Sequence, residues 1–515
     1  MKRIYLNCRT LTILAVFLFS MQAFGQRTTV NYPDSWYETG FKLEHQDKNG
    51  VRVAFSIRDF VISQEMIEGE QMHLLELHGS FLPNDEGAPN VPGNGRYIAI
   101  PQGSTPSVRI LSSRTETFEN INLAPAPNIP LGDDDNPIRF IRNMDIYNTD
   151  AFFPAQPVIK SEITQIRGVD VVILGITPFQ YNPVSKQLIV HRDIRVEVNF
   201  EGGNGQFGEE RFRNRWWDHI LSDAIMNHES LPEVDYSQRV IHAALSEETG
   251  AEYLIIVPTE PVFAQWADSI RRFRQRQGIS TKVVNISQVG GNTSAAIESY
   301  INNAYNTWSI PPAAVLLMAD HGTDAANSIT STVLNNHPGG GSYNPYISDM
   351  PYADISGNDL PDITFARITA RNAAELQLMV KKFLDNERNP PTNPSYYNNP
   401  ITAMGWQTER WFQICAEVVF GFWEIVHGKS PVRINALYSG SPGSVWSTNT
   451  NTHMVVNYFG PNGLGYIPAT PAHLTNWSGN ATQVNNAINS GAFMLMHRDH
   501  GSETGWGEPA YSNSN

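Results

Sequence analysis

The first part of the chain alternates apolar and polar residues with a period of two. Between residues 27 and 203 the alternation is clearest over 51–57 and 194–200, as in strands that bury one face. Turn-forming sequences such as Asn49-Gly50 and Asn182-Pro183 separate the apolar runs, and no long helical period interrupts them. We therefore expect an antiparallel β-sandwich over residues 26–203.

The period changes after residue 250. The run 253–257 is continuously apolar, which is typical of a buried parallel strand. A helical pattern over 261–277 follows, and Gly278 ends it. The same kind of reading predicts further strands at 281–284, 314–318, 435–438 and 492–496, and further helices at 294–303, 373–387 and 481–489. Alternating strands and helices predict an α/β domain with a mainly parallel sheet over residues 251–515.

Residues 204–250 fit neither pattern. Arg211, Arg213 and Arg215 lie close together and are followed by Trp216-Trp217. The segment has two interpretations. It is either a linker whose exposed arginines a processing protease could cut, or a peripheral helix packed on one domain.

The N-terminus has the features of an export signal. A basic start precedes the apolar run 11–19, which is too short to span a bilayer, and Ala23 and Gly25 provide the small residues of a cleavage site. We expect a signal peptide over residues 1–25, with a membrane anchor as the alternative. The mature protein would be secreted or held at the cell surface after export through the periplasm. No later stretch is apolar enough to predict a transmembrane segment.

Charge narrows the range of partners. The 515-residue chain has 36 Lys and Arg against 51 Asp and Glu, a formal net charge of −15. Nucleic-acid binding needs clustered cations, so we expect no nucleic-acid partner. The chain has two cysteines, Cys8 and Cys415. Because Cys8 lies in the predicted signal peptide, we expect no internal disulfide in the exported chain.

Two predicted strands end in a His-Gly turn. Strand 314–318 leads to His321-Gly322, and strand 492–496 leads to His500-Gly501. Ligands of open α/β sheets bind beyond the carboxyl ends of strands, where an imidazole could act as general acid and base beside backbone N–H donors. The alternatives are a solvated loop histidine and, for His497 with His500, a metal pair. No third or fourth metal ligand is evident in the sequence.

The sequence His500-Gly501-Ser502-Glu503, with Trp506 three residues later, resembles the gingipain-type cysteine peptidases. The resemblance extends over most of residues 251–515. Its supporting matches are at Asp320-His321, 349–352, 357–359 and 365–367. The resemblance implies a caspase-like α/β catalytic domain that acts on protein or peptide substrates. It also implies that the β-rich part is an inhibitory propeptide that contacts its own catalytic domain, so that the chain is a zymogen.

The resemblance assigns roles to three residues. His500 matches the catalytic histidine, which accepts the thiol proton and later protonates the leaving amine. The backbone N–H of Gly501 matches an oxyanion-hole donor. Glu409 is the best match to an auxiliary acidic residue that orients the histidine, and its alternative is a surface carboxylate beside Arg410. The mechanism requires no cofactor. A structural calcium ion is compatible with such secreted peptidases, but the sequence assigns it no ligands.

The catalytic cysteine of this family follows the histidine by a few tens of residues. Cys415 precedes His500 and lies in a helical pattern, which rarely presents a thiolate to a cleft. We expect that Cys415 is not the nucleophile, that the sequence stops short of that residue, and that the present chain is inactive. Primary specificity does not transfer, because Phe420 stands where Arg- or Lys-selective members have a carboxylate. The alternative function is a non-enzymatic exported protein that uses the scaffold for binding or in a bacterial protein-secretion machinery.

Overall fold

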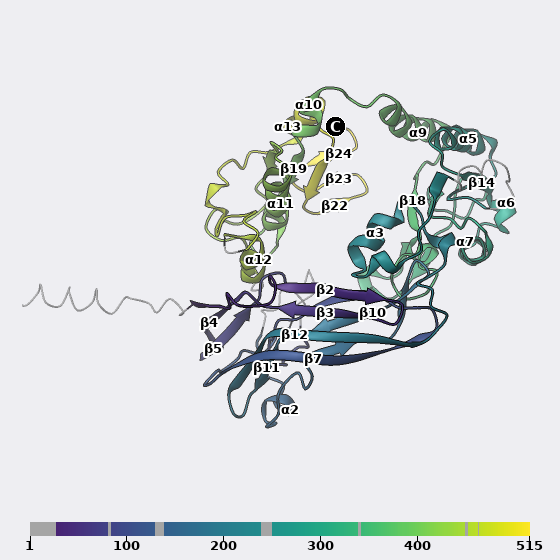
Figure 1. The fold of residues 1–515 in the computed structure, drawn as a ribbon. Helices are drawn as coiled ribbons and strands as arrows, with labels where there is room; N and C mark the ends of the chain where they lie inside the picture. The colour runs from purple at the N-terminus through teal and green to yellow at the C-terminus, as the bar shows by residue number, and fades with distance from the viewer. Residues whose placement is uncertain are drawn as a thin grey trace, which may run out of the picture.

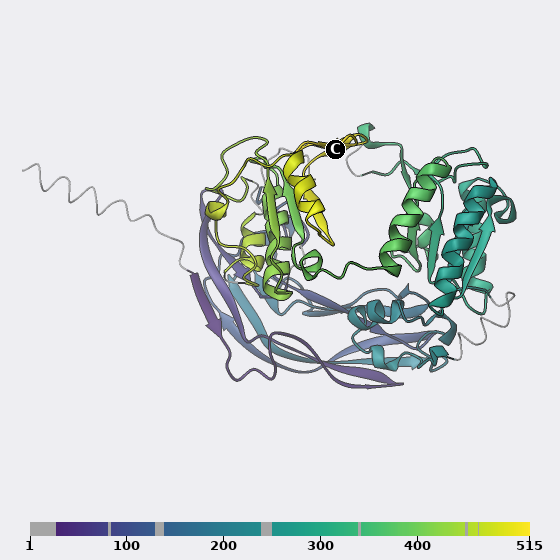
Figure 2. The same cartoon turned by 90° about the horizontal axis from the view of Figure 1, so that it is seen from above.

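Three structural units make up the computed structural model, which describes residues 27–80, 84–128, 139–237, 250–337, 341–448, 452–461 and 463–515. We call residues 27–237 the β unit, 250–389 the first α/β unit and 390–515 the second α/β unit. The two α/β units lie over opposite ends of the β unit (Figures 1 and 2). The predicted signal peptide lies outside the described residues.

The strands of the β unit pair antiparallel in three sheets. The first has the order β1-β4-β5, from strands Arg27–Asn31, Asp59–Ile67 and Glu70–Glu76. The second has the order β6-β10-β8, with β9 also on β10, from Asn94–Ala99, Val169–Ile176, Val158–Lys160 and Thr164–Ile166. The third has the order β11-β12-β3-β2, with β7 also on β12, from Phe179–Asn182, Gln187–Gly202, Gly50–Ser56, Gly40–Asp47 and Ser104–Phe118. The short helix α2 spans Met144–Tyr147.

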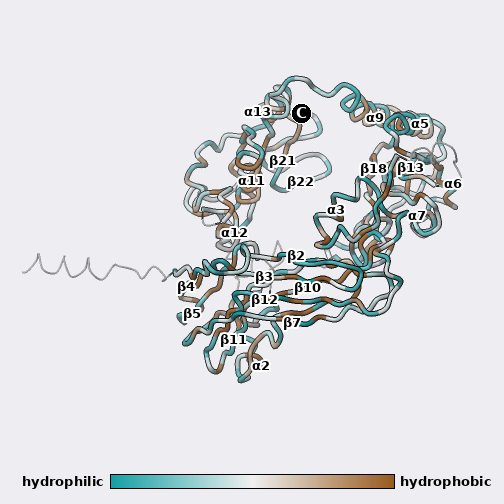
Figure 3. Tube along the Cα trace, viewed as in Figure 1, coloured by the Kyte–Doolittle hydropathy of each residue, from teal (hydrophilic) through white to brown (hydrophobic). Residues whose placement is uncertain are grey.

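One hydrophobic cluster joins the second and third sheets. Its fully buried members include Val53 of β3, Ile98 of β6, Val172 of β10 and Val196 of β12. Hydrophobic and hydrophilic stretches alternate along the strands of the β unit (Figure 3). The period-two alternation thus gives each strand one face for this shared core.

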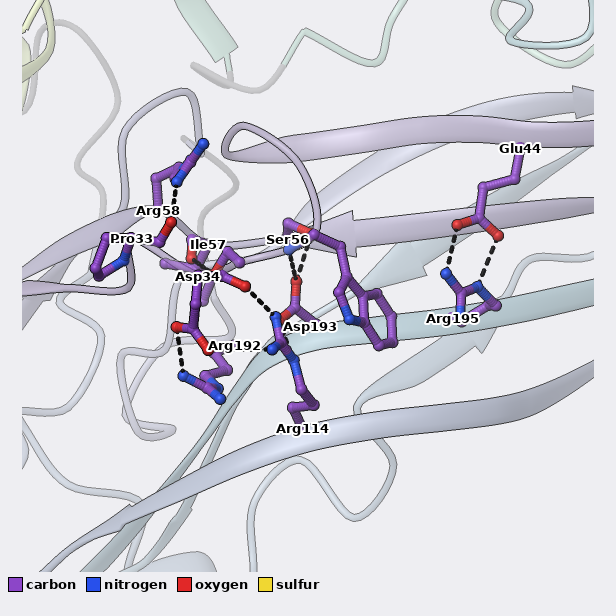
Figure 4. A network of polar contacts seen from close by, with 12 residues as sticks. Pro33, Asp34, Glu44, Ser56, Ile57, Arg58, Arg114, Arg192, Asp193 and Arg195 are labelled. Carbon is purple, nitrogen blue, oxygen red and sulfur yellow. Dashed lines mark hydrogen bonds and ion pairs between the residues drawn. The ribbon is translucent and has the colours of Figure 1, made fainter.

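A buried carboxylate ties the start of the β unit to its long sheet. Asp193 of β12 is completely buried and accepts hydrogen bonds from Trp36 N at 2.9 Å, Ser56 Oγ at 2.6 Å and Arg114 Nε at 2.8 Å (Figure 4). A second ion pair joins Arg195 of β12 to Glu44 of β2 at 2.7 Å (Figure 4). Both arginines also stack over the Trp36 ring. The segment before β2 is therefore held by charge-assisted bonds to strands distant in sequence.

The first α/β unit contains a four-stranded parallel sheet of order β14-β13-β15-β18. Its strands span Thr281–Asn285, Tyr253–Val257, Ala314–Leu317 and Thr364–Arg367, and its helices are α5 (Pro261–Arg276), α6 (Ile286–Val289), α7 (Ser294–Thr307), α8 (Met350–Ala353) and α9 (Ala373–Arg388). The short strands β16 (Thr332–Leu334) and β17 (Tyr346–Ser348) pair antiparallel beside it.

The second α/β unit contains a three-stranded parallel sheet of order β20-β19-β21. Its strands span Val432–Asn435, Ile401–Met404 and Leu495–Arg498, and its helices are α10 (Pro394–Asn398), α11 (Phe412–Gly421), α12 (Thr452–Phe459) and α13 (Ala481–Asn489). After β21 the chain forms a small antiparallel sheet of β22 (Gly501–Ser502), β23 (Gly505–Trp506) and β24 (Tyr511–Ser512).

The parallel strands predicted at 253–257, 281–284 and 314–318 are confirmed, and the strands after residue 250 are divided between two sheets. The prediction at 435–438 is wrong in position, because the residues that pair in parallel with β19 are Val432–Asn435. Strand β21 begins at Leu495, three residues later than the apolar run suggests, because Phe493 and Met494 are exposed. His497 therefore lies inside the strand. The caspase-like arrangement of these elements stays a prediction.

A helix lies in the segment predicted as either a linker or a peripheral helix. Helix α3 (Trp217–Ala224) follows η1 (Glu210–Phe212), and Trp217 Nε1 donates to Ala313 O at 3.0 Å. Arg211 bonds to Tyr305 O at 2.9 Å, and Arg213 pairs with Asp218. The peripheral-helix interpretation thus fits residues 210–224, while processing at the arginines stays a prediction. Residues 238–249 lie outside the described part.

Candidate active site

The predicted catalytic residues follow the carboxyl ends of neighbouring parallel strands. His500 comes two residues after β21, and Glu409 lies in the turn between β19 and α11. Because β19 and β21 pair in parallel, both loops leave the same edge of the sheet. Tyr438 follows β20 and brings the third loop to that edge.

Aromatic rings surround the His500 imidazole. The Phe412 ring, at the start of α11, lies 5.3 Å from it at an interplanar angle of 84°. The Tyr438 ring lies 6.4 Å away at 62°. His500 itself is exposed, and its backbone carbonyl accepts a hydrogen bond from Gly507 N at 2.7 Å. The imidazole is therefore orientated by edge contacts and open to solvent, as an acid–base group needs to be.

Asp499 packs beneath the His500 loop. Its Oδ1 accepts a hydrogen bond from His500 N, and its buried Oδ2 lies against Gly405 without a hydrogen-bond partner. A Cβ at position 405 would lie 1.7 Å from this oxygen, so the loop after β19 needs glycine there. Burial raises the pKa of Asp499, although its bond from His500 N and nearby positive charges act against that shift.

The Asp499→Asn variant is expected to be more stable than the wild type at pH 7, by about 1 kcal/mol, since asparagine keeps the acceptor and removes an ill-solvated charge. A raised folded-state pKa contributes stability below the unfolded pKa, and this contribution is lost as the pH rises through the folded pKa. The difference in Tm should therefore shrink from pH 7 towards pH 4.

The control for that prediction is Asp385→Asn, on the exposed side of α9, where the Asp385 side chain is 54% exposed. This control should change stability by under about 0.5 kcal/mol. A destabilised Asp499→Asn variant at pH 7 would show that the carboxylate itself holds the loop.

His497 is packed into the fold by an aromatic ring and a backbone hydrogen bond. Its ring stacks on Trp506 at 4.2 Å, and its Nε2 donates to Glu508 O at 3.2 Å. Burial lowers the pKa of His497, which favours the neutral ring. Among the described residues, no group of three or more His, Cys, Asp or Glu side chains is placed to hold a metal ion.

The structure places Gly501 and Glu409 without testing their roles. Gly501 is exposed, and a Cβ there would meet Gly505 O at an ordinary 3.6 Å, so packing alone does not require glycine. The Glu409 side chain is 50% exposed and lies 3.9 Å from Arg410 Nε. In the described part of the chain, no hydrogen bond or ion pair joins Glu409 to His500.

Cys415 lies within α11, where its backbone N–H donates to Trp411 O at 3.0 Å. Its side chain is partly buried against the cluster that contains Met404, Ile414 and Trp446. The thiol thus contributes to the packing of the helix on the sheet. This placement is typical of a small hydrophobic residue.

The other His-Gly turn is tied into the first α/β unit. His321 Nδ1 accepts a hydrogen bond from Ser331 N at 3.0 Å. Nearby, Asp349 pairs with Arg367 at 2.8 Å. Burial alone would raise the pKa of Asp349, but the bonds and charge of Arg367 hold it below the usual value. The bond from Ser331 N ties the His321 ring to the loop before β16.

Phe420, at the position compared with the family's specificity carboxylate, is buried. The Arg433 guanidinium lies 3.5 Å from the centre of its ring, and Arg433 pairs with the buried Glu417 at 2.7 Å. Sequence reasoning missed Phe412, Tyr438 and Asp499 as neighbours of His500. Phe412 lies in a segment predicted as helical, and Tyr438 ends the strand predicted at 435–438, which the structure places at Val432–Asn435. Their positions after neighbouring strands are the signal that could have suggested them.

None of the helices in the described residues is both long and apolar enough to cross a bilayer.

Two family models match the chain in succession. The model of the C25 propeptide matches residues 43–233, and the model of peptidase family C25 matches residues 246–515. The second match covers just over half of the chain. The boundary between the two falls among residues 234–245, after the last 3-10 helix of the β unit, η2 (His228–Ser230).

Similar curated proteins come from Porphyromonas gingivalis. A Lys-gingipain is 22% identical over 468 residues, which cover 89% of this chain and 24% of that protein. A gingipain R2 is 21% identical over 431 residues, which cover 82% of this chain and 50% of that protein. The chain thus spans between about a quarter and half of the length of these relatives.

Similar solved structures belong to the same group. A complex of the pro- and mature domains of RgpB from Porphyromonas gingivalis matches with a TM-score of 0.33 and 21% identity, over 36% of this chain and 97% of that chain. The Arg-specific cysteine proteinase gingipain R matches with a TM-score of 0.36 and 17% identity, over 52% of this chain and 51% of that chain.

Proposed function

Because the chain belongs to peptidase family C25, we propose that it is the precursor of a secreted cysteine endopeptidase that hydrolyses protein or peptide substrates. The observation that carries the proposal is the place of His500. It follows the carboxyl end of β21 within the residues matched to the family, with an exposed imidazole between two aromatic rings.

In the proposed mechanism His500 accepts the proton of a cysteine thiol, and the thiolate attacks the scissile carbonyl carbon. The backbone N–H of Gly501 donates to the oxyanion of the tetrahedral intermediate, and Glu409 orients the imidazole. Protonated His500 then gives its proton to the leaving amine. Water, deprotonated by His500, hydrolyses the acyl-enzyme and regenerates the thiol. No step needs a cofactor, and a structural calcium ion would affect stability only.

We also propose that the nucleophilic thiol is not among these 515 residues. Cys8 falls in the predicted signal peptide, and Cys415 packs against its own sheet from within α11. A thiol within a helix and packed against the sheet is poorly placed to reach a substrate carbonyl in a cleft.

Residues 27–515, produced alone, are therefore expected to give no peptide hydrolysis above the uncatalysed rate. The Cys415→Ser variant should match the parent chain in this assay. A fluorogenic peptide library measures hydrolysis, and circular dichroism shows that the variant is folded. Hydrolysis that disappears in the Cys415→Ser variant would contradict the assignment and make Cys415 the nucleophile.

The proposed division of the chain is a signal peptide (1–25), a β-sandwich propeptide (26–203), a connecting segment (204–250) and a caspase-like peptidase domain (251–515). The zymogen would be exported through the periplasm and matured outside the cell or at its surface. If the protein isolated from its natural source hydrolyses no peptide after removal of the β unit, a non-enzymatic binding or secretion-machinery function replaces this proposal.

A further inference from the structure

Arg167 lies at the tip of a hairpin in the β unit, where an arginine would ordinarily be exposed, yet only 1% of its surface is accessible. Its Nε–H donates to Phe212 O at 3.0 Å, and its NH1 donates to Pro312 O at 3.0 Å and Asp362 O at 2.7 Å. Its backbone N–H donates to Asp362 Oδ1 at 3.0 Å. The first α/β unit thus supplies two of the three residues that accept these bonds.

Two aromatic rings complete the surroundings of this guanidinium. Its central carbon lies 5.3 Å from the centre of the Trp217 ring and 5.4 Å from that of Tyr305. Planar guanidinium groups stack on aromatic faces while they donate in their own plane, which lysine cannot do. The site therefore fits arginine in particular. We call Phe212, Trp217, Tyr305, Pro312 and Asp362 the Arg167 socket.

The backbone at this tip is also unusual. Arg167 and Gly168 have φ values of 48° and 71°, the left-handed pair of a two-residue hairpin turn between β9 and β10. Asn or Asp normally precedes glycine in such turns, and a long side chain there costs about 1 kcal/mol. A Cβ on Gly168 would lie 2.5 Å from the Phe212 ring. Strain of this kind persists where the surrounding contacts require that residue.

The socket lies far in the topology from the candidate active site. Pro312 precedes β15 and Asp362 precedes β18, so the socket is at the amino ends of two neighbouring strands of the first sheet. His500 follows the carboxyl end of a strand in the other sheet. Contacts at the socket can hold the β unit without involving the residues around His500.

Further bonds flank the socket. Asn358 Nδ2 donates to Thr164 Oγ1 at 2.7 Å and to Gln165 O at 2.8 Å. Leu360 of the first α/β unit packs against the hydrophobic cluster of the β unit. Helix α3 lies between the two units (Figure 1). A buried arginine with a rim of weaker polar contacts is the usual anatomy of an interface whose affinity depends on a few residues.

We propose that Arg167 is the main contact of an interface that holds the β unit on the first α/β unit after the chain has been cut between residues 237 and 250. This interface does not occupy the active site. The proposal rests on the proposed division into propeptide and peptidase, but not on the catalytic assignments. Affinity of the propeptide and blockage of the site are then separable properties. Truncation of the Arg167 side chain would leave the backbone carbonyls of Phe212, Pro312 and Asp362 without this buried donor. The bond from the Arg167 backbone N–H to Asp362 Oδ1 would remain.

The test uses the full chain with a site for a sequence-specific protease inserted between residues 237 and 250. The chain is immobilised by its C-terminus and cut, and the release rate of the β unit is followed. The wild-type β unit should stay bound for hours. Arg167→Ala should release it at least about 100-fold faster, and Arg167→Lys at least about 10-fold faster, because lysine cannot supply the planar fork.

The matched control is Lys186→Ala. Lys186 is an exposed cation with φ of 55° in the turn between β11 and β12, away from the socket. The β unit with Lys186→Ala should be released at the same rate as the wild-type β unit. Should Arg167→Ala fail to fold before cutting, Arg167→Lys decides. Rapid release of the wild-type β unit, wild-type release in the Arg167→Lys variant, or equal acceleration by Lys186→Ala would each overturn the proposal. The readout needs no activity, so failure of the catalytic proposal would leave this test unaffected, and failure of this test would leave the catalytic proposal unaffected.

Discussion

Replacement of His500 by alanine is expected to lower kcat/KM for peptide hydrolysis by at least about 1,000-fold in any active form of the protein. Both proton transfers of the proposed mechanism pass through this imidazole. The ring is exposed and orientated by Phe412 and Tyr438, so its removal should leave the surrounding loop folded. The assay compares initial rates on a fluorogenic peptide, with circular dichroism to show that the variant is folded.

His321→Gln is the matched control for this prediction, since His321 lies in the other His-Gly turn. Its Nδ1 accepts a backbone hydrogen bond in the first α/β unit, so its replacement should change kcat/KM by under about 5-fold. Tyr438→Phe keeps the ring beside His500 and should also have a small effect. A variant lacking His500 that retained a tenth of the activity would remove His500 from the mechanism.

Replacement of Asp193 by alanine is expected to destabilise the β unit by about 3 kcal/mol. The variant removes the shared acceptor of Trp36 N, Ser56 Oγ and Arg114, and leaves the arginine without its buried partner (Figure 4). Loss of one member of a buried ion pair costs about 3–5 kcal/mol, and the partial exposure of Arg114 places the effect at the lower end.

Hydrogen exchange measures this effect locally, because unfolding of a chain with several units is not a single two-state transition. Amides of residues 32–36 and of β3 should exchange about 100-fold faster in the Asp193→Ala variant, while those of α9 should not change. Glu201→Ala, at the exposed end of the same strand, is the control and should leave exchange unaltered. Unchanged exchange at residues 32–36 would show that Asp193 does not hold this segment.

Local sequence signals predicted several elements to the residue. Strand β13 was expected at 253–257 and is found there, and α13 begins after Asn480, whose side chain caps it in a capping box with Gln483. Helix α9 extends one residue beyond its expected end. In these elements the hydrophobic period and the cap agree, so tertiary contacts had little to override.

Long-range pairing could not be predicted in the same way. β3 and β12 pair from Gly50 with Asn199 to Ser56 with Asp193, across more than a hundred residues. Such contacts also decide whether two apolar runs pair in the same sheet. Strands β18 and β21, for example, belong to two different parallel sheets. The apolar residues Phe493 and Met494 are exposed, which explains why the strand boundary before His500 was misplaced.

The candidate site was predictable in chain position but not in surroundings. The turn after a strand identified the place of His500, because strand ends can be read from apolar runs. The position of Asp499 against Gly405, and of Phe412 and Tyr438 around the ring, depends on the parallel pairing of β19 with its neighbours. The socket of Arg167 likewise joins residues 195 positions apart, and the sequence shows only an Arg-Gly turn there.

The most direct test is covalent labelling of the protein isolated from its natural source. A peptidyl acyloxymethyl ketone reacts with an activated thiol, and mass spectrometry of the digest identifies the labelled residue. We predict labelling of a cysteine other than Cys415, and loss of that labelling in the His500→Ala variant. Labelling of Cys415, or labelling that persists without His500, would contradict the account.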